Sequence, residues 1–413
     1  MNNKTNNLPF ENVTILAAEH FETAPICTCM LAELGANVIR VEKPGSGEGG
    51  RAMGPVFENK RGEKLSSFYF RFNHNKKSVA IDLKHPKGKE LFLKLAELSD
   101  VVVENFRPGV MTKLGLGYEK LKQVKPDIIY ATVTGFGHSD IYQSPYVDRP
   151  AFDLLAQAYS GLMYTVSNTD EPTWVGLPAG DHYGGIMAVI GIISALYYRE
   201  LTGKGQHVDI AMYDCALHLN ERRVNIYDVL GVKTNKMTNI GSAPYGPYKA
   251  KDGYIAISGG QPPVWPRFCK AVGREDLLED VTLKTTQDRA KNYPRLRKIV
   301  EEWLKDKTRE EALEIFYKYE VPAAPVHDEI DLFNCPHVKA RKMIIEYESD
   351  YSGKRRVVGN PVKLSLMKEK EPTPPPDVGE NTREILKDML NIPLPEIERL
   401  KDEGIVFWKS EQE

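Results

Sequence analysis

The sequence predicts an α/β protein, with a doubly wound parallel sheet in its N-terminal part and a smaller α+β domain after it. Three observations lead to this fold class. Short apolar runs alternate with helical patterns over the first 140 residues, as in chains of βαβ units. Further along, two strand-like runs flank the turn KAKDG, which indicates a hairpin. The 413 residues are also enough for two domains, or for one large domain with a substantial insertion.

The first 140 residues show this alternation most clearly. Residues 13–21 (VTILAAEHF) predict a buried strand, residues 25–36 a helix ended by Gly35, and residues 37–45 the next strand. Such a βαβ unit favours parallel strand pairing. The same reasoning predicts, in chain order, a strand at 78–84, a helix at 86–98, a strand at 100–106, a helix around 119–123 and a strand at 127–137.

The rest of the chain predicts mainly helices and the hairpin. We predict a large domain over 1–200, a small domain over 201–330, and a linker and C-terminal segment over 331–413 that returns to the large domain. Residues 369–382 are proline-rich and indicate an exposed linker. The expected elements are a helix over 151–165, a long apolar helix after the turn GLPAGD, a strand at 205–212, a helix over 216–230, the hairpin within 243–260, helices over 262–272 and 292–318, an extended segment at 319–328 and a helical region after 382.

Composition and charge exclude several classes of protein. The formal net charge of −2 argues against a dedicated nucleic-acid binder, which usually carries a basic excess. The polar N-terminus lacks the apolar core of a signal peptide. The longest apolar run, residues 184–198, is shorter than the roughly 20 residues needed to cross a bilayer. We therefore expect a soluble, cytoplasmic protein that binds neither nucleic acid nor membrane.

The five cysteines predict reduced, buried thiols and no metal site. They are scattered and odd in number, which argues against a disulfide framework. Cys27 and Cys29 form a CxC pair, but no second cluster completes a zinc site. NAD binding is also disfavoured. Glu42 ends the second strand, where such folds hold a ribose, but the first strand runs into HFETAP rather than G-x-G-x-x-G.

Asp181 is the candidate catalytic residue. It is the one carboxylate in residues 176–198, and it lies between glycines at the start of the long apolar helix. In one interpretation it caps the helix, where free N–H groups and the helix dipole favour an acid. In the other it is a covalent nucleophile. The second is favoured because glycines would let a large substrate approach the acid. These glycines are Gly176, Gly180, Gly184 and Gly185.

Basic residues gather at the predicted strand ends of the first domain. Open α/β sheets bind ligands beyond the carboxyl ends of their strands, so these cations suit a phosphorylated ligand held without a glycine loop. Solvated surface charge is the alternative interpretation. The residues are Arg40, Lys43, Arg51, Lys76, Lys77, Arg107 and Lys113.

Several segments resemble the class III coenzyme A transferases, the family of formyl-CoA, carnitine and bile-acid CoA-transferases. The matching segments are spread over most of the chain in the family's order. Among them are ILAAEHFETAP, FNHNKKSVAIDLK, ENFRPGVMTKLGLGYE, YATVTGFG, GDHYGGIMAVIGIISALYYRELTGKGQHVDIAM, APYGPYKAKDGYIAI and VGENTREIL. The resemblance implies a Rossmann-like large domain, a small domain, and a homodimer of ring-shaped subunits interlocked with each other.

The resemblance also implies a reaction and its residues. Asp181 aligns with the family's catalytic aspartate, which attacks an acyl-CoA thioester and passes through an acyl–aspartyl anhydride and an aspartyl-CoA thioester. Acyl-CoA and a small carboxylic acid are then the substrates, and no cofactor is bound permanently. The CoA-binding residues implied by the matching motifs are His20, Phe21, Glu22, Lys43, Lys76, Asn105, Phe106 and Lys113.

Two other functions stay open at this point. α-Methylacyl-CoA racemases belong to the same superfamily and pair the aspartate with a histidine in GHD. The matching stretch here is AFD, with Phe152 in place of the base. A non-enzymatic acyl-CoA-binding protein is the other alternative. Within the transferases, Glu22 replaces a glutamine and Thr134 a lysine of the formyl-CoA enzyme, which argues against an oxalate or formyl-CoA substrate.

Overall fold

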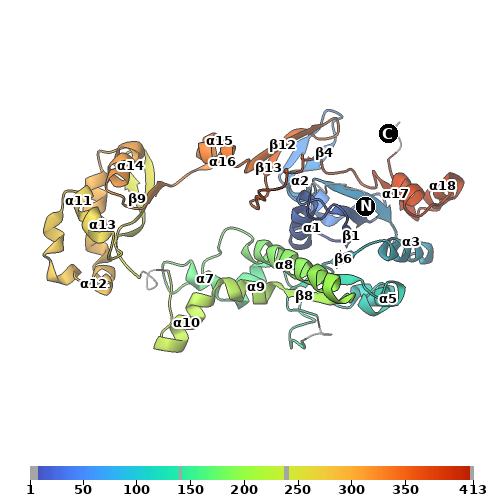
Figure 1. Cartoon of the computed structure of the whole chain (residues 1–413), viewed down its shortest axis with the longest axis horizontal. Coiled ribbons are helices and arrows are strands. Elements are labelled where there is room, and N and C mark those ends of the chain that lie inside the picture. The colour runs from blue at the N-terminus through green and yellow to red at the C-terminus, as the bar shows by residue number, and fades with distance from the viewer. Residues whose placement is uncertain (1–7, 139–141, 237–240, 410–413) are drawn as a thin grey trace. The chain divides into compact units, whose positions relative to one another are not determined.

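The computed structural model describes residues 8–138, 142–236 and 241–409 and is drawn in Figure 1, where some of its elements are labelled. Contacts between residues divide the chain into two compact units. The larger unit holds residues up to 163, 173–225 and 341 onward, and the smaller unit holds 164–172 and 226–340. Residues 201–225 therefore group with the larger unit.

A seven-stranded sheet forms the centre of the larger unit. Its strands lie in the order β14-β5-β2-β1-β6-β7-β8, and β14 alone of these seven runs antiparallel to its neighbour. The predicted parallel sheet is thereby confirmed. The strands are β1 Thr14–Ala18, β2 Asn37–Glu42, β5 Lys76–Ile81, β6 Val101–Glu104, β7 Ile129–Thr134, β8 His207–Ala211 and β14 Val406–Phe407.

The strand order gives the sheet a switch point near its centre. Numbered along the chain, the six parallel strands lie as 3-2-1-4-5-6, the order of doubly wound dinucleotide folds. The chain moves outward from β1 to β2 and β5, and in the opposite direction from β6 to β7 and β8. Sheets of this kind bind ligands beyond the carboxyl ends of the two strands at the switch point, here β1 and β6.

Helices cover both faces of the sheet, because successive residues of a strand point to opposite faces. On one face, Ile15 and Ala17 of β1 pack into a core with helices α1 (Thr23–Glu33) and α8 (Ala179–Thr202). On the other face, Leu16 and Ala18 pack into a second core with four helices, which are α3 Pro86–Glu97, α5 Tyr118–Val124, α17 Thr382–Asp388 and α18 Leu394–Asp402. Burial on both faces explains why the strands are continuous apolar runs in the sequence.

Helix α8 is the predicted long apolar helix. By length and composition it could cross a membrane. Ala188, Ile192 and Ala195 instead lie in the core of the larger unit, so α8 is a core helix, as predicted. It begins at Ala179, five residues before the apolar run from which it was predicted.

The smaller unit contains the predicted hairpin, formed by β9 (Tyr245–Ala250) and β10 (Gly253–Ser258). A third strand, β11 (Ala323–Pro325), pairs antiparallel with β10. The predicted helix over 292–318 is two helices, because Thr308 caps a new helix through a capping box with Glu311. The helices of this unit include α11 Trp265–Ala271, α12 Thr286–Lys291, α13 Tyr293–Leu304, α14 Arg309–Lys318, α15 Glu329–Asn334 and α16 Pro336–Ala340.

Two hairpins were not predicted. They are β3 (Val56–Glu58) with β4 (Lys64–Ser66), and β12 (Ile344–Ser349) with β13 (Gly353–Val358). The predicted helices over 151–165 and 216–230 are each broken into two. The other helices are α2 Ser67–Arg71, α4 Val110–Leu114, α6 Asp153–Tyr159, α7 Leu162–Thr165, α9 Met212–Leu219 and α10 Glu221–Leu230, with short 3₁₀ turns at Gly49–Ala52, Glu275–Leu278 and Val281–Leu283.

Candidate active site

A cavity lies beyond the carboxyl ends of β1, β6 and β7, at the switch point of the sheet. Its volume is about 960 Å³, open solvent at its mouth included. The loops that follow these strands form part of its wall, and the first turn of α8 forms another part. It brings together the following residues predicted from the sequence: His20, Phe21, Glu22, Asn105, Phe106 and Asp181.

Asp181 lies in the first turn of α8 and does not cap the helix. The capping carboxylate is that of Asp153, at the start of α6. Its Oδ1 accepts hydrogen bonds from the N–H groups of Gly180 (2.7 Å) and Asp181 (3.3 Å). The interpretation of Asp181 as a helix cap is therefore wrong. Because Asp153 satisfies these N–H groups, the carboxylate of Asp181 is left to face the cavity.

The Asp181 carboxylate is held by one side chain from α1. The hydroxyl group of Thr23 donates a hydrogen bond to Asp181 Oδ1. Burial raises the pKa of Asp181 to about 7. The hydrogen bond from Thr23 opposes this rise, and the negative charges of Asp153 and Glu22 add to it. The site therefore holds an acid that titrates near neutral pH.

The glycines near Asp181 allow close packing of helices. A Cβ at Gly185 would lie 2.8 Å from the carbonyl oxygen of Thr23, and one at Gly184 would lie 3.1 Å from the Thr23 side chain. A Cβ at Gly180 would lie 3.0 Å from α6. The prediction that these three glycines clear space for a substrate is wrong, because α1 and α6 fill that space. Only at Gly176 would a Cβ meet no described atom within 4 Å.

The loop after β1 is tied to the loop after β6. The His20 N–H donates to Asn105 Oδ1 at 2.8 Å, and Asn105 Nδ2 donates back to the His20 carbonyl oxygen at 2.9 Å. Phe106 packs edge-on against the His20 ring, with 4.6 Å between ring centroids. Phe21 has a φ of +58°, a conformation that costs about 1–3 kcal/mol outside glycine. Its ring lines the cavity and contacts Phe152 edge-on.

Glu22 is held from two directions. Its Oε1 accepts a hydrogen bond from Arg71 NH2 at 2.6 Å and lies 3.1 Å from His182 Nε2. The His182 ring also packs edge-on against Phe72, with 5.6 Å between centroids. His182 therefore faces Glu22, although it follows Asp181 directly in the sequence.

Basic residues at the strand ends mostly neutralise acids inside the protein. The buried Lys76 Nζ lies 2.7 Å from Glu19 Oε1, and Arg40 lies 3.9 Å from Glu19 and 3.1 Å from Glu48. Burial lowers the pKa of Lys76, and the attraction of Glu19 opposes that shift. The prediction that these cations gather around a phosphorylated ligand is therefore wrong for Arg40 and Lys76, whose side chains are fully buried.

Arg51 and Lys77 are also paired. Arg51 donates to both oxygens of Glu42, at 2.7 and 2.6 Å. Burial alone would raise the pKa of Glu42, but its bonds to Arg51 and Ser78 and the charge of Arg40 lower it to about 2. Lys77 forms a surface ion pair with Glu384 at 2.7 Å.

Three of the predicted CoA-binding residues lie outside the cavity. Lys76 is buried as described, Lys43 is exposed after β2, and Lys113 lines a neighbouring hollow. That hollow shares Pro108 and Val147 with the cavity, so the two are continuous along one surface of the larger unit.

Other residues of the cavity were not predicted as site residues. Thr23 lines the cavity and Asp153 follows Phe152 of its wall; both belong to stretches noted in the sequence, ILAAEHFETAP and AFD, but only the fold brings them to Asp181. Arg149 lines the cavity, stacks on the Tyr146 ring at 3.9 Å and donates to the Tyr159 hydroxyl at 2.6 Å. Phe152, noted in the sequence as the replacement for a racemase base, lines the cavity with a ring that cannot accept a proton.

The chain is similar to known proteins over most of its length. Residues 10–382 match the family model described as CoA-transferase family III. The chain is 34% identical over 359 residues to succinyl-CoA:mesaconate CoA-transferase of Haloarcula hispanica, over 86% of this chain and 90% of that protein. It is 32% identical to the beta subunit of succinyl-CoA–L-malate CoA-transferase of Chloroflexus aurantiacus, over 98% of this chain and 100% of that one.

A solved structure has the same fold. The crystal structure of a CAIB/BAIF family protein from Brucella suis matches this chain with a TM-score of 0.82 and 30% sequence identity. The match covers 93% of this chain and 100% of that one.

Proposed function

The chain belongs to CoA-transferase family III, and we propose that it moves coenzyme A from an acyl-CoA donor to a carboxylic acid through covalent intermediates on Asp181. The observation that carries this proposal is the geometry of Asp181. Its carboxylate faces a cavity at the switch point of the sheet, Thr23 orients one of its oxygens, and Asp153 takes over the capping of α8. A carboxylate placed in this way can attack an acyl group held in the cavity.

The proposed reaction has two symmetric halves. The Asp181 carboxylate attacks the donor thioester, forming an acyl–aspartyl anhydride and releasing CoA thiolate. The thiolate attacks the aspartyl carbonyl, giving an aspartyl-CoA thioester and the free donor acid. The acceptor carboxylate then attacks this thioester, and the released thiolate attacks the acceptor's acyl carbonyl. The products are acceptor-CoA and the regenerated aspartate, so no water enters the net reaction.

The start of α8 supplies one favourable field for the oxyanions that form in each step, against the negative charges of Asp153 and Glu22, which raise the pKa of Asp181. Each tetrahedral intermediate carries negative charge near Asp181, in the first turn of α8. The positive end of the helix dipole stabilises such charge. Every step of the proposed reaction passes through such an intermediate, so the dipole of α8 acts on each of them.

We propose that the CoA moiety binds along the loops after β1 and β6. His20, Phe21, Glu22, Asn105 and Phe106 line the cavity beside Asp181, which supports their assignment as CoA contacts. Lys113 would lie along the continuous neighbouring hollow. Lys43 and Lys76 have less support, since Lys43 lies outside both hollows and Lys76 is buried. CoA is a substrate here, and the proposal includes no permanently bound cofactor.

A dicarboxylic acid is the proposed class of acceptor. Arg149 and Arg107 both line the cavity that contains Asp181, so a cation can bind the second carboxylate while the first one reacts. The acceptors named for the two relatives, mesaconate and L-malate, are also dicarboxylic acids. A monocarboxylic acid has no second carboxylate for these cations to bind, so a dicarboxylic acid should be preferred.

Matched acceptors test this assignment. With succinyl-CoA as donor, glutarate should give a higher kcat/KM than valerate, which has the same chain length and one carboxylate. Arg149→Met should remove most of that preference, because its guanidinium is the proposed partner of the second carboxylate. Lys77→Met, at a distant surface ion pair, is the control. Equal kcat/KM for the two acids in the wild-type protein would rule out the dicarboxylate proposal without affecting the covalent mechanism.

We further propose an interlocked, cytoplasmic homodimer, as the family resemblance implies. The outer side of α8 exposes Ile190 (50%), Tyr197 (67%) and Leu201 (65%), and no residue of α10 is buried. Apolar side chains exposed in such number usually mark an interface. A second copy of the chain is the proposed partner for these helices.

A further inference from the structure

Helix α1 and the turn before β5 bring together three side chains that can bind a metal ion. Cys29 and Glu33 lie four residues apart on α1, so they share one side of the helix. His74 lies in the turn that precedes β5. One ligand atom from each residue lies within 4.8 Å of the other two. None of these residues lines the candidate active site.

The distances between donor atoms suit a zinc ion. His74 Nε2 lies 3.0 Å from Glu33 Oε1 and 3.5 Å from Cys29 Sγ. Around tetrahedral zinc with ordinary bond lengths, the nitrogen would lie about 3.3 Å from the oxygen and about 3.6 Å from the sulfur. Cys29 Sγ also lies 3.6 Å from His74 Nδ1, so it faces the imidazole ring rather than the outer side of Nε2. The ring or the Cys29 side chain must therefore rotate to admit the ion.

The chemistry and charge of the cluster also favour zinc. Thiolate and imidazole ligands select zinc over magnesium or calcium, which prefer oxygen ligands. Cys29 (3% exposed) and His74 (1% exposed) are buried. A zinc ion with one thiolate and one carboxylate carries no net charge, which limits the cost of burial. The nearby ammonium group of Lys370 is bound by the carbonyl oxygen of Ala32 at 3.1 Å.

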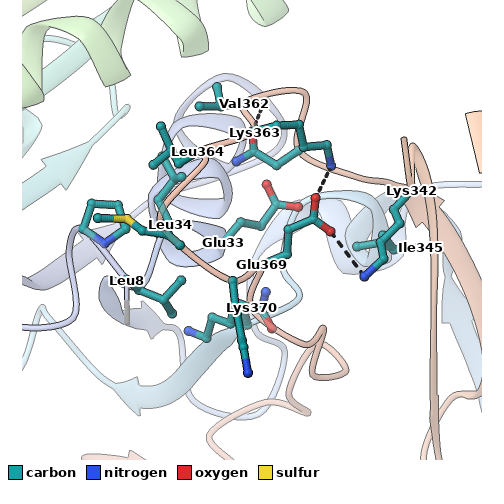
Figure 2. Close-up of a pocket in the computed structure, with 15 residues that line it drawn as sticks. Leu8, Glu33, Leu34, Lys342, Ile345, Val362, Lys363, Leu364, Glu369 and Lys370 are labelled. Carbon is teal, nitrogen blue, oxygen red and sulfur yellow. Dashed lines mark hydrogen bonds and ion pairs between the residues drawn. The ribbon is translucent and has the colours of Figure 1, made fainter. Parts of the chain in front are cut away.

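A hollow in the larger unit borders the cluster at Glu33, while neither Cys29 nor His74 lines it. Glu33 is one of the residues that line this hollow, among the side chains drawn in Figure 2. At its rim, Glu369 pairs with Lys363 at 2.6 Å and with Lys342 at 3.8 Å. The hollow gives solvent access to the carboxylate side of the cluster, where a water molecule can complete a four-coordinate site.

We propose that Cys29, Glu33 and His74 form a zinc site that fastens α1 to the turn before β5. Cys29 releases its thiol proton to solvent when its Sγ binds the ion, and His74 Nε2 and a Glu33 oxygen supply the other two protein ligands. Cys27, the other member of the CxC pair, lies in the core between α1 and the sheet and takes no part. The site is independent of the proposed transferase chemistry, because Asp181 needs no metal for its steps.

The test uses the full-length protein, freed of metal by a chelator and then given Zn²⁺ or Co²⁺ alone. We expect one equivalent of zinc to stay bound after gel filtration. We also expect cobalt to produce a thiolate-to-metal charge-transfer band in the near ultraviolet. Cys29→Ser should lose this band and bind zinc more than about a hundredfold more weakly, since even outer-shell changes cost about 10- to 100-fold. Cys27→Ser is the matched control and should keep both properties.

Two results would overturn the proposal. One is wild-type protein that retains less than stoichiometric zinc, which decides the question even if a variant misfolds. The other is a folded Cys29→Ser protein that gives the same cobalt band as the wild type. His74→Gln, which keeps a hydrogen-bonding group at the same place, is a second variant that should also weaken zinc binding. Circular dichroism verifies that each variant is folded.

Discussion

At the scale of single residues, two different acids take the two roles that one acid at a helix start could combine: capping the helix and facing the substrate cavity. Asp153 accepts hydrogen bonds from free N–H groups at the start of α8. Asp181 accepts a hydrogen bond from the Thr23 hydroxyl and faces the cavity. Burial gives Asp181 a pKa of about 7. A carboxylate with a raised pKa is a stronger nucleophile when ionised, but less of it is ionised at neutral pH.

The pH dependence of the reaction follows from this balance. In the proposed mechanism only the carboxylate form of Asp181 attacks, so kcat/KM for the acyl-CoA donor should rise with pH and level off above a midpoint near 7. Below the midpoint we expect about a tenfold loss per pH unit. Because kcat/KM reports the free enzyme, a profile that is flat on both sides of pH 7 would contradict the assigned state of Asp181.

Two neighbouring residues should move that midpoint in opposite directions. Thr23→Val removes a hydrogen bond that lowers the pKa of Asp181, so the midpoint should shift to higher pH, while Thr23→Ser keeps it in place. Asp153→Asn removes a negative charge that raises the pKa, so the midpoint should shift to lower pH. The same kcat/KM profiles measure both shifts. If both variants keep the midpoint of the wild-type protein, neither residue shifts the pKa of Asp181.

At the scale of elements, buried ion pairs join three neighbouring strands. Glu19 follows β1, Arg40 lies in β2 and Lys76 begins β5, and their side chains are fully buried together. A buried charge that loses its partner is strongly destabilising, whereas an exposed pair contributes little. These basic residues therefore stabilise the part of the sheet formed by β1, β2 and β5.

Substitution of adjacent lysines distinguishes the two kinds of pair. Lys76→Met leaves Glu19 buried without its closest cation, so we expect a loss of about 3–5 kcal/mol in the free energy of unfolding. Lys77→Met removes an exposed pair with Glu384 and should cost about 0–1 kcal/mol. Urea denaturation measures both. A Lys76→Met protein as stable as Lys77→Met would mean that the buried pair does not hold the strands.

Elements with strong periodicity were predictable, and those set by distant contacts were not. Strands β1, β2, β5, β6, β7 and β8 and the hairpin of β9 and β10 carry apolar runs or turn residues of their own. The β12–β13 hairpin lacks an apolar run, because several of its residues are charged and exposed. Strand β14 is two residues long and is defined only by pairing with β5. The local sequence therefore predicts neither the β12–β13 hairpin nor strand β14.

The same limit applies to the site. Asp181 could be singled out as a candidate because it is a lone acid in an apolar run, although three of the glycines that favoured a nucleophile pack against α1 and α6. Its partners Thr23 and Asp153 lie 158 and 28 residues away, and only folding brings them to it. Lys76 and Arg40 look like surface cations at strand ends, since a sequence does not reveal that Glu19 will be buried beside them.

At the scale of the whole molecule, α8 and α10 expose apolar side chains that the second copy of the proposed homodimer would cover. For an interlocked dimer, light scattering should give twice the 46.6 kDa chain mass. Dilution should not release monomers, because linked rings separate only when a subunit unfolds. A folded, active monomer in dilute solution would contradict the proposed assembly.

The central claim is that Asp181 forms a covalent bond to CoA, and trapping the intermediate tests it most directly. Hydroxylamine added with an acyl-CoA donor should convert the aspartyl thioester to a hydroxamate, located on Asp181 by peptide mass spectrometry. Asp181→Ala should lose at least about four orders of magnitude in CoA exchange while it still binds CoA. The account is contradicted if Asp181 stays unmodified during turnover, or if Asp181→Ala exchanges CoA at the wild-type rate.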